Sequence, residues 1–504
     1  MKTTSYGARA FCAFYIRQQC YDAENFLSLY SFFLTCAKYD DVTFRLRDQL
    51  LLCMNCRAGG ASFISHTLAD CLVRIHIQRE IMASSKIRPK ILVSDKDGNI
   101  YDHPDLLMLC RRGNDLAQPR PDELMPLPEG SDIFMLPGRR ALGLDPETGE
   151  VELMEEYAVS AFVAPAHTLT AHAAYKSEDD APTLPLFAYG AVGYANGKFY
   201  VAAKKVDQDV RQVFKGFSGK KIKRFAHGIL EKYPDNRLMQ HIMNKCVLKY
   251  SCPAARNLAI GRYEAPLPTS RTCNARCIGC ISFQEETSQI CASPQDRLDF
   301  SPTAEEVVGV MRHHAANETE KPIYSFGQGC EGEPLTEADM ITEAITMFRS
   351  EGGEGTINMN TNASLPDKIA KLCDAGLSSI RVSLNSAREE VYNRYYRPKG
   401  YTFADVKQSI IEAKARGKWV SLNLLFFPGV TDSESEFEAL VNLISETKLD
   451  FVQLRNLNID PEMYLDLLSD VDFGASMGFT FFRKRMKKAC PWIEFGYFNP
   501  FVEE

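Results

Sequence analysis

The sequence contains no run of apolar residues long enough to cross a membrane as a helix, which takes about 18 of them. It also lacks an excess of basic residues, because 58 Lys and Arg stand against 65 Asp and Glu, a formal net charge of −7. The basic field that attracts nucleic acid is therefore missing. The best candidate for a signal peptide, residues 26–36, follows Asp22 and Glu24 where a basic leader is required, so we do not expect one.

The sequence gives no sign of a disulfide framework. Its 16 cysteines are scattered over 504 residues, and the one dense group has the spacing of metal ligands. Free thiols persist in a reducing compartment, so we expect a cytoplasmic protein. The length and a hydrophobic fraction of 45% are enough for two or three domains, each with its own core.

Residues 1–81 differ from the rest of the chain. They are irregular, rich in cysteine and aromatic residues, and show neither a helical nor a strand period. At Met82 the composition changes to that of a regular globular protein. We expect Met82 to be the native start and residues 1–81 to be an upstream translated extension. Peptides from residues 11–45 in a digest of the native protein would contradict this expectation.

Residues 88–206 are predicted to form a small, mainly β domain. Strand-like runs are separated by turn pairs, of which Asn196-Gly197 is the clearest hairpin signal. The run 131–136 is expected to end at Pro137-Gly138. Residues 207–262 show spaced apolar positions and are predicted to be a helical linker region. No catalytic residue is assigned in either segment.

Strand and helix patterns alternate over residues 263–460, which predicts a parallel sheet. With the segment that leads into Cys273, six strands are expected. The other strands are predicted at 322–326, 356–360, 379–384, 420–426 and 451–454, and the helices at 303–314, 337–350, 365–375, 403–416 and 433–445. We therefore predict an α/β fold, a partial (β/α)6 TIM-like barrel with an N-terminal, mainly β accessory domain. Residues 461–504 are predicted to be a C-terminal closing segment.

The dense cysteine group follows the first of these strands, where barrels carry their chemistry. Its spacing is Cys273-x3-Cys277-x2-Cys280. Three thiolates on a compact loop can hold a 4Fe–4S cluster and leave one iron open, since four ligands are usual. They can equally be part of a structural zinc site completed by a distant Cys or His. The spacing alone leaves both alternatives open.

Residues 263 to about 460 resemble the core domain of the radical S-adenosylmethionine (SAM) enzymes. The cysteine triplet is similar to the cluster motif of that family, and Glu331-Gly332-Glu333-Pro334 resembles its Gly-Gly-Glu-Pro motif. Asn360-Thr361-Asn362 is similar to the family's Thr-Asn-Gly turn. The resemblance covers about two-fifths of the chain, in the order and spacing that the family shows.

The resemblance implies a cofactor set and a reaction. Cys273, Cys277 and Cys280 would hold a 4Fe–4S cluster that reductively cleaves SAM to a 5′-deoxyadenosyl radical. The radical would abstract hydrogen from a substrate that the sequence does not identify, and a flavodoxin or ferredoxin would supply the electron. The residues that the resemblance places around SAM are Gly332, Glu333, Pro334, Asn362, Ser383 and Asn385. No catalytic residue is assigned.

Two positions depart from the family pattern. Gly279 stands where the family often has an aromatic residue against the adenine, so another side chain must cover that face of the base. Glu331 replaces the first glycine of the Gly-Gly-Glu motif, and we assign it no role. Farther along, four residues could reach the site, but a surface helix is the expected structure for most of them: Tyr392, Arg394, Tyr395 and Arg397.

One alternative function belongs to a different class, an iron–sulfur protein that binds SAM or senses redox state without turnover. An auxiliary iron–sulfur cluster is a further prediction. Its candidate ligands are Cys246, Cys252, Cys291, Cys330 and Cys490.

Overall fold

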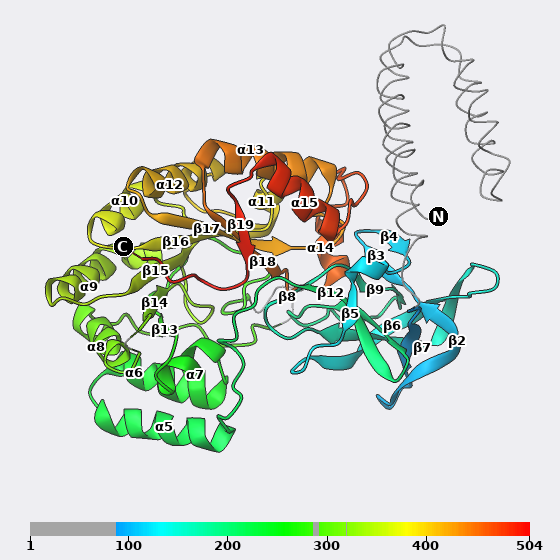
Figure 1. Cartoon of the computed structure of the whole chain (residues 1–504), viewed down its shortest axis with the longest axis horizontal. Helices are drawn as coiled ribbons and strands as arrows, with labels where there is room; N and C mark the ends of the chain where they lie inside the picture. The colour runs from blue at the N-terminus through cyan, green and yellow to red at the C-terminus, as the bar shows by residue number, and fades with distance from the viewer. Residues whose placement is uncertain (1–86, 286–291, 319, 504) are drawn as a thin grey trace, which may run out of the picture. The chain divides into compact units, whose positions relative to one another are not determined.

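The computed structural model describes residues 87–285, 292–318 and 320–503 (Figure 1). The predicted extension 1–81 and Cys291 lie outside the described residues. Residues 84–504 form one compact unit. None of the helices in the described ranges is long and apolar enough to cross a membrane.

The first part of this unit is built from antiparallel strands joined in one 12-stranded sheet. They are β1 (Lys90–Ser94), β2 (Ile100–Met108), β3 (Cys110–Arg112), β4 (Asp115–Ala117), β5 (Leu124–Pro126), β6 (Asp132–Leu144), β7 (Val151–Phe162), β8 (His167–Leu169), β9 (His172–Ala173), β10 (Tyr175–Ser177), β11 (Gly190–Ala195) and β12 (Lys198–Lys205), with the short 3-10 turn η3 (Pro121–Glu123). The mainly β character predicted for this segment is what the structure has.

Two turn signals in this part have different outcomes. Asn196 and Gly197 have φ of 50° and 76° and join β11 to β12 with Ala195 opposite Lys198, as the hairpin prediction requires. The prediction that a strand ends at Pro137-Gly138 is wrong, because β6 continues to Leu144. Its pairing with β7 shifts register between Met135 and Arg140, so a bulge absorbs the two turn residues and the strand continues.

A helical segment connects this part to the second sheet. It consists of α5 (Gly219–Lys232), α6 (Arg237–His241), the π-helical turn η4 (Ile242–Lys249) and α7 (Pro253–Ala259). Their buried side chains, such as Ile222, Leu238 and Leu258, belong to the same apolar core as the second sheet.

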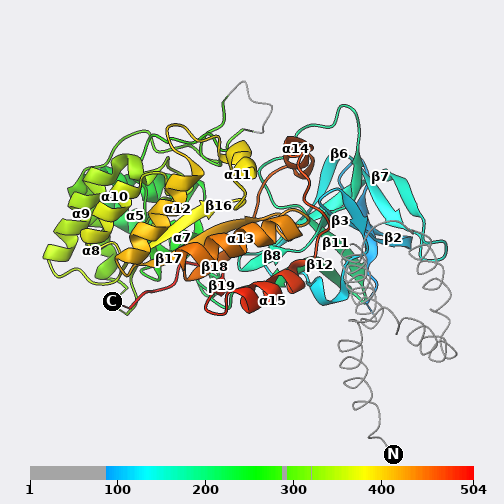
Figure 2. The ribbon, with the colours of Figure 1, turned by 90° about the horizontal axis from the view of Figure 1, so that it is seen from above.

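The second sheet has seven parallel strands in chain order, so every predicted strand is present. They are β13 (Glu264–Leu267), β14 (Ile323–Phe326), β15 (Thr356–Thr361), β16 (Ser379–Leu384), β17 (Trp419–Phe426), β18 (Phe451–Asn456) and β19 (Glu494–Gly496). The connections contain α8 (Ala304–Ala315), η5 (Pro334–Glu337), α9 (Ala338–Ser350), α10 (Pro366–Asp374), α11 (Glu389–Tyr396), α12 (Phe403–Ala415), α13 (Glu434–Thr447), α14 (Pro461–Leu467) and α15 (Phe479–Ala489). The predicted α/β class is confirmed. Helices α8, α9, α10, α12 and α13 follow one another along the outer side of the sheet (Figures 1 and 2).

The strands of this sheet have two chemically different faces. One face is apolar and buried in the core with the helices: Ala265, Leu267, Tyr324, Phe326, Ile357, Met359, Ile380, Val382, Leu384, Val420, Leu422, Leu424, Phe426, Val452 and Leu454. The alternate positions, which register places on the opposite face, are mostly polar: Glu264, Ser325, Thr356, Asn358, Asn360, Ser379, Arg381, Ser383, Ser421, Asn423, Gln453 and Arg455. Parallel strands covered by helices on both faces are usually apolar on both. The polar face is therefore the surface available for binding.

The first part of the unit packs on the loops that follow β17 and β18. Thr168 Oγ1 donates to the Leu454 carbonyl at 2.6 Å. Arg139 forms a buried ion pair with Asp460 at 3.0 Å. Both contacts lie at the carboxyl ends of the strands, so the β-rich part borders the edge of the sheet where a site is expected.

Candidate functional site

The cysteine loop begins at the carboxyl end of β13 and is fixed on the end of α11. The Arg276 amide donates to the Tyr396 carbonyl at 2.9 Å, and the Ile278 amide donates to the Tyr395 carbonyl at 3.1 Å. These carbonyls are among those that a helix terminus leaves without an intrahelical partner. The loop satisfies them and is thereby held in one position.

The three thiols lie within one another's electrostatic field. Burial, followed by the charge of Glu333, raises the pKa of Cys273 to about 11. Burial, then Cys280 and Cys273, raises the pKa of Cys277 well above its ordinary value. Buried thiolates that repel each other need a nearby cation, such as bound iron. Arg297 contributes one fixed charge, since its Nη2 lies 3.6 Å from Cys280 Sγ.

The three thiols of the loop are a donor set that iron–sulfur clusters use. Among the described residues, no three His, Cys, Asp or Glu side chains converge closely enough to hold one metal ion. A zinc site requires such convergence on one centre. A 4Fe–4S cluster does not, because each iron takes its own thiolate. The donor set is therefore compatible with the cluster that the spacing suggested.

The Glu331 carboxylate is hydrogen-bonded to the residues that lead from β13 into the cysteine loop. Its carboxylate accepts hydrogen bonds from the amides of Thr269 (2.7 Å), Ser270 (2.9 Å) and Gln328 (2.7 Å). Burial raises its pKa to about 7 against these hydrogen bonds, which lower it. The carboxylate for which the sequence suggested no role thus links β13 to the loop after β14.

The Gly332 backbone is pressed against the residue before the first cysteine. A Cβ at Gly332 would lie 1.9 Å from the Thr272 carbonyl oxygen, so only glycine fits there. The Gly332 amide donates to the Ser270 carbonyl, and the Glu333 amide donates to the Thr272 carbonyl, both at 2.8 Å. The two segments therefore lie side by side.

Glu333 and Pro334 begin the short helix η5. The Glu333 carboxylate is 4% exposed and accepts from the amides of Leu335 (3.1 Å) and Asn362 (2.8 Å). Burial raises its pKa to about 7. Glu333 also influences the thiol of Cys273, so the structure brings this predicted SAM residue to the cysteine loop.

The remaining predicted SAM residues differ in their surroundings. Asn362 is near the loop, because its Nδ2 donates to Asn274 Oδ1 at 2.8 Å. Ser383 is half-buried on the polar face of β16. Asn385 is 1% exposed, and its Nδ2 donates to Tyr464 Oη at 3.1 Å.

The space that a side chain at Gly279 would occupy is taken by Tyr395. A Cβ there would lie 2.5 Å from Tyr395 Oη and 3.3 Å from Cζ. Tyr395 is 4% exposed and Tyr392 is fully buried, so these two side chains face the interior, whereas Arg394 and Arg397 are accessible. The sequence made Tyr395 a candidate to reach the site, but it did not predict the contact with Gly279, because the two positions are far apart in the chain.

Of the cysteines predicted as ligands of an auxiliary cluster, some lie close together and others do not. Cys246 Sγ lies 3.9 Å from Cys330 Sγ, and both are buried. Cys490 is buried elsewhere, with its Sγ 3.7 Å from Ser445 Oγ. Cys291 lies outside the described residues. The auxiliary cluster stays a prediction.

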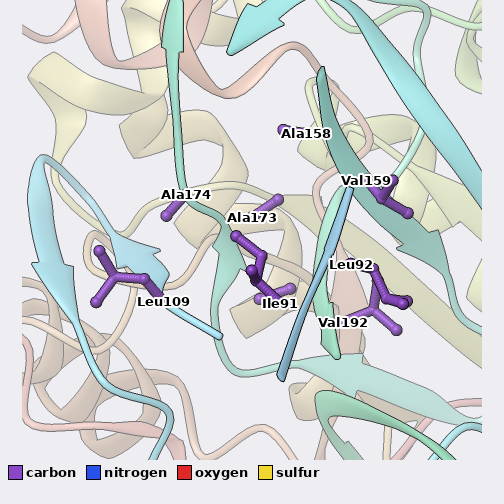
Figure 3. Close-up of a pocket in the computed structure, with 9 residues that line it drawn as sticks. Ile91, Leu92, Leu109, Ala158, Val159, Ala173, Ala174 and Val192 are labelled. Carbon is purple, nitrogen blue, oxygen red and sulfur yellow. The ribbon is translucent and has the colours of Figure 1, made fainter. Parts of the chain in front are cut away.

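Two hollows lie away from these residues. A cavity of about 10 Å³ in the β-rich part is lined by aliphatic side chains, including Ile91, Leu109 and Val192, and has room for no more than about one water molecule (Figure 3). A groove of about 560 Å³ between the end of β12 and α15 is lined by several cations, such as Lys204 and Arg483. Neither contains a residue of the predicted site.

Residues 267–444 match the family model described as the radical SAM superfamily. These residues belong to that superfamily. The radical SAM domain thus runs from the last residue of β13 into α13 and includes the cysteine loop, the Glu331–Pro334 segment and α11. Members of this superfamily bind a 4Fe–4S cluster and SAM, which are the two cofactors that the sequence predicts.

Curated relatives match over part of their length. A GTP 3′,8-cyclase of Limosilactobacillus fermentum is 27% identical over 196 residues, 38% of this chain and 52% of that protein. The enzyme of the same name from Thermodesulfovibrio yellowstonii is 34% identical over 124 residues, 24% of this chain and 38% of its own. The chain therefore spans about half or less of these relatives. A solved structure, Streptococcus suis SuiB bound to SAM, has a TM-score of 0.33 at 14% identity, covering 64% of this chain and 72% of that one.

Proposed function

We propose that the protein is a radical SAM enzyme in which Cys273, Cys277 and Cys280 hold a 4Fe–4S cluster. The bound cofactors would supply one chemistry: an electron passed to the sulfonium breaks the C5′–S bond, leaving methionine and a 5′-deoxyadenosyl radical that removes hydrogen from substrate. The observation that carries the proposal is the docking of the cysteine loop between Gly332 and the end of α11, inside a matched radical SAM domain.

The residues around the loop have separate proposed tasks. Gly332, Glu333 and Pro334 would bind the SAM amino group, since a carboxylate beside exposed carbonyls suits an ammonium. Asn362, Ser383 and Asn385 would contact its ribose and carboxylate. Tyr395 would cover the adenine where Gly279 provides no side chain. Its position in the space of a residue-279 side chain supports this assignment.

We infer further that β13–β18 curve into a partial (β/α)6 barrel, with residues 461–504 closing its open side. Gln453 on β18 donates to Asn499 Oδ1 at 2.9 Å, and Asn499 Nδ2 donates to Glu264 on β13 at 2.9 Å. These bonds connect the first and sixth strands, which supports closure by the C-terminal segment. The division into residues 88–206, 207–262 and 263–460 is proposed on the same architecture.

The electron donor is proposed to be a flavodoxin or ferredoxin, because the cluster must be reduced from outside. The nine cysteines of the described ranges are free thiols, which supports a reducing, cytoplasmic setting. GTP is the substrate named for the relatives, but the partial match leaves the substrate of this chain open.

The test is anaerobic reconstitution with iron and sulfide, followed by SAM and dithionite. We expect a brown protein that forms 5′-deoxyadenosine, and a C273A/C277A/C280A variant that binds no cluster and forms none. A C373A variant, which removes a buried thiol on α10, is the matched control and should keep both properties. Bound SAM without cleavage would favour a SAM-binding or redox-sensing protein, and a colourless zinc protein would contradict the cluster.

A further inference from the structure

Two arginines on the polar face of the second sheet have no acidic partner. Arg381 lies on β16 and Arg455 on β18, on the polar face. Arg381 Nη1 donates to Gln453 Oε1 at 3.1 Å, and Arg455 Nη1 donates to the Tyr497 carbonyl at 3.0 Å. In the part of the chain that the structure describes, neither guanidinium forms an ion pair.

The acidic group that acts on Arg381 electrostatically, Glu264, already has other partners. Glu264 lies 3.6 Å from Arg211 and accepts a hydrogen bond from Asn499. Burial, followed by the charge of Arg455, lowers the pKa of Arg381 to about 9. Interior cations are normally paired, because an unpaired buried charge is costly. The two guanidinium groups repel each other, so an anion bound between them would stabilise both.

The surface around these arginines is built to receive a ligand. Arg381, Ser383, Asn423, Leu425 and Arg455 are all partly accessible, whereas the alternate residues of β16 and β17 are fully buried. Two polar atoms on this face, Arg381 Nε and Asn423 Oδ1, are buried and have no hydrogen-bond partner in the described structure. A buried guanidinium N–H without a hydrogen-bond partner is energetically costly, and a bound acceptor would remove that cost.

The two arginines are distinct from the predicted SAM residues, and Ser383 borders both groups. Ser383 comes two residues after Arg381 on β16, nearer the carboxyl end where the cysteine loop lies. Arg381 is thus deeper along the same face, beyond the residues proposed for SAM. A molecule held there lies beside the cofactor site without using its ligands.

We propose that Arg381 and Arg455 bind an oxyanion of the substrate, a carboxylate or a phosphate, on the polar face of β16–β18. Guanidinium groups suit this task because their N–H donors match both oxygens of such a group. The proposal rests on the proposed function, since it assigns the substrate class of the same enzyme. It goes beyond that function by restricting the substrate to anions.

The test measures anion binding by titration calorimetry on reconstituted protein saturated with SAM. Sodium pyrophosphate and sodium succinate are the probes, and the one that binds identifies phosphate or carboxylate. We expect the R381Q and R455Q variants to bind that probe at least tenfold more weakly. Arg224→Gln on the exposed side of α5 is the matched control and should bind as the wild type does.

Two further measurements on the same samples, SAM affinity and melting temperature, distinguish anion binding from a structural role of these arginines. SAM affinity should be equal in all variants. The melting temperature of R381Q should not fall, because the new amide can still donate to Gln453 and one uncompensated charge is removed. R381K and R455K keep the charge and should retain part of the binding.

Four outcomes would overturn the proposal: neither probe binds the wild type at millimolar concentration, the Gln variants bind as tightly as the wild type, SAM affinity falls in parallel with probe affinity, or R381Q melts well below the wild type. Parallel loss would assign the arginines to the SAM carboxylate. Because probe binding needs no SAM cleavage, a wild type that binds the probe without forming 5′-deoxyadenosine would contradict the proposed function alone.

Discussion

Three glutamates of the radical SAM domain are buried, and burial raises the pKa of each to about 7: Glu331, Glu333 and Glu436. Glu331 and Glu333 accept hydrogen bonds from backbone amides that position the loops around the cysteines. Glu436 is different, because its oxygens accept from the Ser386 hydroxyl, at 2.7 and 2.8 Å, and it is not one of the predicted cofactor residues. It is therefore suited to a test of burial alone.

We predict that Glu436→Gln makes the protein more stable at pH 8 and leaves stability near pH 4.5 unchanged. The folded-state pKa of about 7 lies above the ordinary 4.5, so the folded protein holds a proton that the unfolded chain releases between these values. The free energy of unfolding of the wild type thus falls as pH rises through this window, by up to about 3 kcal/mol. The variant cannot lose a proton there.

Urea unfolding at several pH values checks this prediction. Glu438→Gln changes an exposed glutamate on the same helix and should follow the wild type throughout. A wild type whose stability rises between pH 5 and pH 7 relative to Glu436→Gln would contradict it.

At this scale the sequence predicts identities better than orientations. The motif made Gly332 and Glu333 candidates, and the close approach to Thr272 gives a physical reason for the glycine. The orientation of Glu331 toward Thr269 and Ser270 depends on the approach of two loops in space, which residue spacing does not contain. Arg381 likewise lay inside a predicted strand, but its missing partner is visible only in three dimensions.

At the scale of elements, α11 and the cysteine loop form one contact. The helix supplies two carbonyls to the loop and fills the space beside Gly279 with Tyr395. The five outer helices of the α/β sheet and their strands were predictable because apolar residues recur at helical or strand spacing. A surface helix was expected for most of the four residues that could reach the site, and the structure buries the two tyrosines among them, Tyr392 and Tyr395.

We predict that Gly279→Ala destabilises the protein by about 1–3 kcal/mol, since the added Cβ would lie 2.5 Å from Tyr395 Oη. Tyr395→Phe removes that oxygen, so the double variant should recover most of the loss. Thermal and urea unfolding of the two single variants and the double variant measure the coupling. Gly228→Ala on α5, where a Cβ meets nothing within 4 Å, is the control and should not destabilise. Additive effects of the two changes would refute the contact.

At the scale of the molecule, a buried ion pair joins the β-rich part to the segment that follows β18. The Arg139 and Asp460 side chains are 3% and 2% exposed, and their ion pair joins β6 to the residue that begins α14. The sequence predicted both parts but not this connection, because Arg139 and Asp460 are 321 positions apart and no local pattern pairs them.

We predict that Arg139→Met lowers the free energy of unfolding by about 3–5 kcal/mol, because it leaves the Asp460 carboxylate buried without its cation. Adding Asp460→Asn removes that charge and should restore part of the loss. Urea unfolding followed by fluorescence and circular dichroism gives both values. Arg312→Met breaks an exposed ion pair with Glu351 and should cause no measurable change. Equal effects of the two Arg→Met changes would contradict the distinction.

The alternation of apolar and polar residues along the parallel strands has a consequence for how such a protein evolves. Residues such as Ile380 and Val382 are buried in the core against the helices. Arg381 and Ser383, which alternate with them, lie on the polar face, where we propose that ligands bind. We expect substitutions on the polar face of these strands to change which substrate is bound and to have little effect on the apolar core. Removing an unpaired buried charge should even stabilise the folded state. A library restricted to the inner positions of β16–β18 should therefore yield a large share of folded variants and is a practical start for redirecting the enzyme to new substrates.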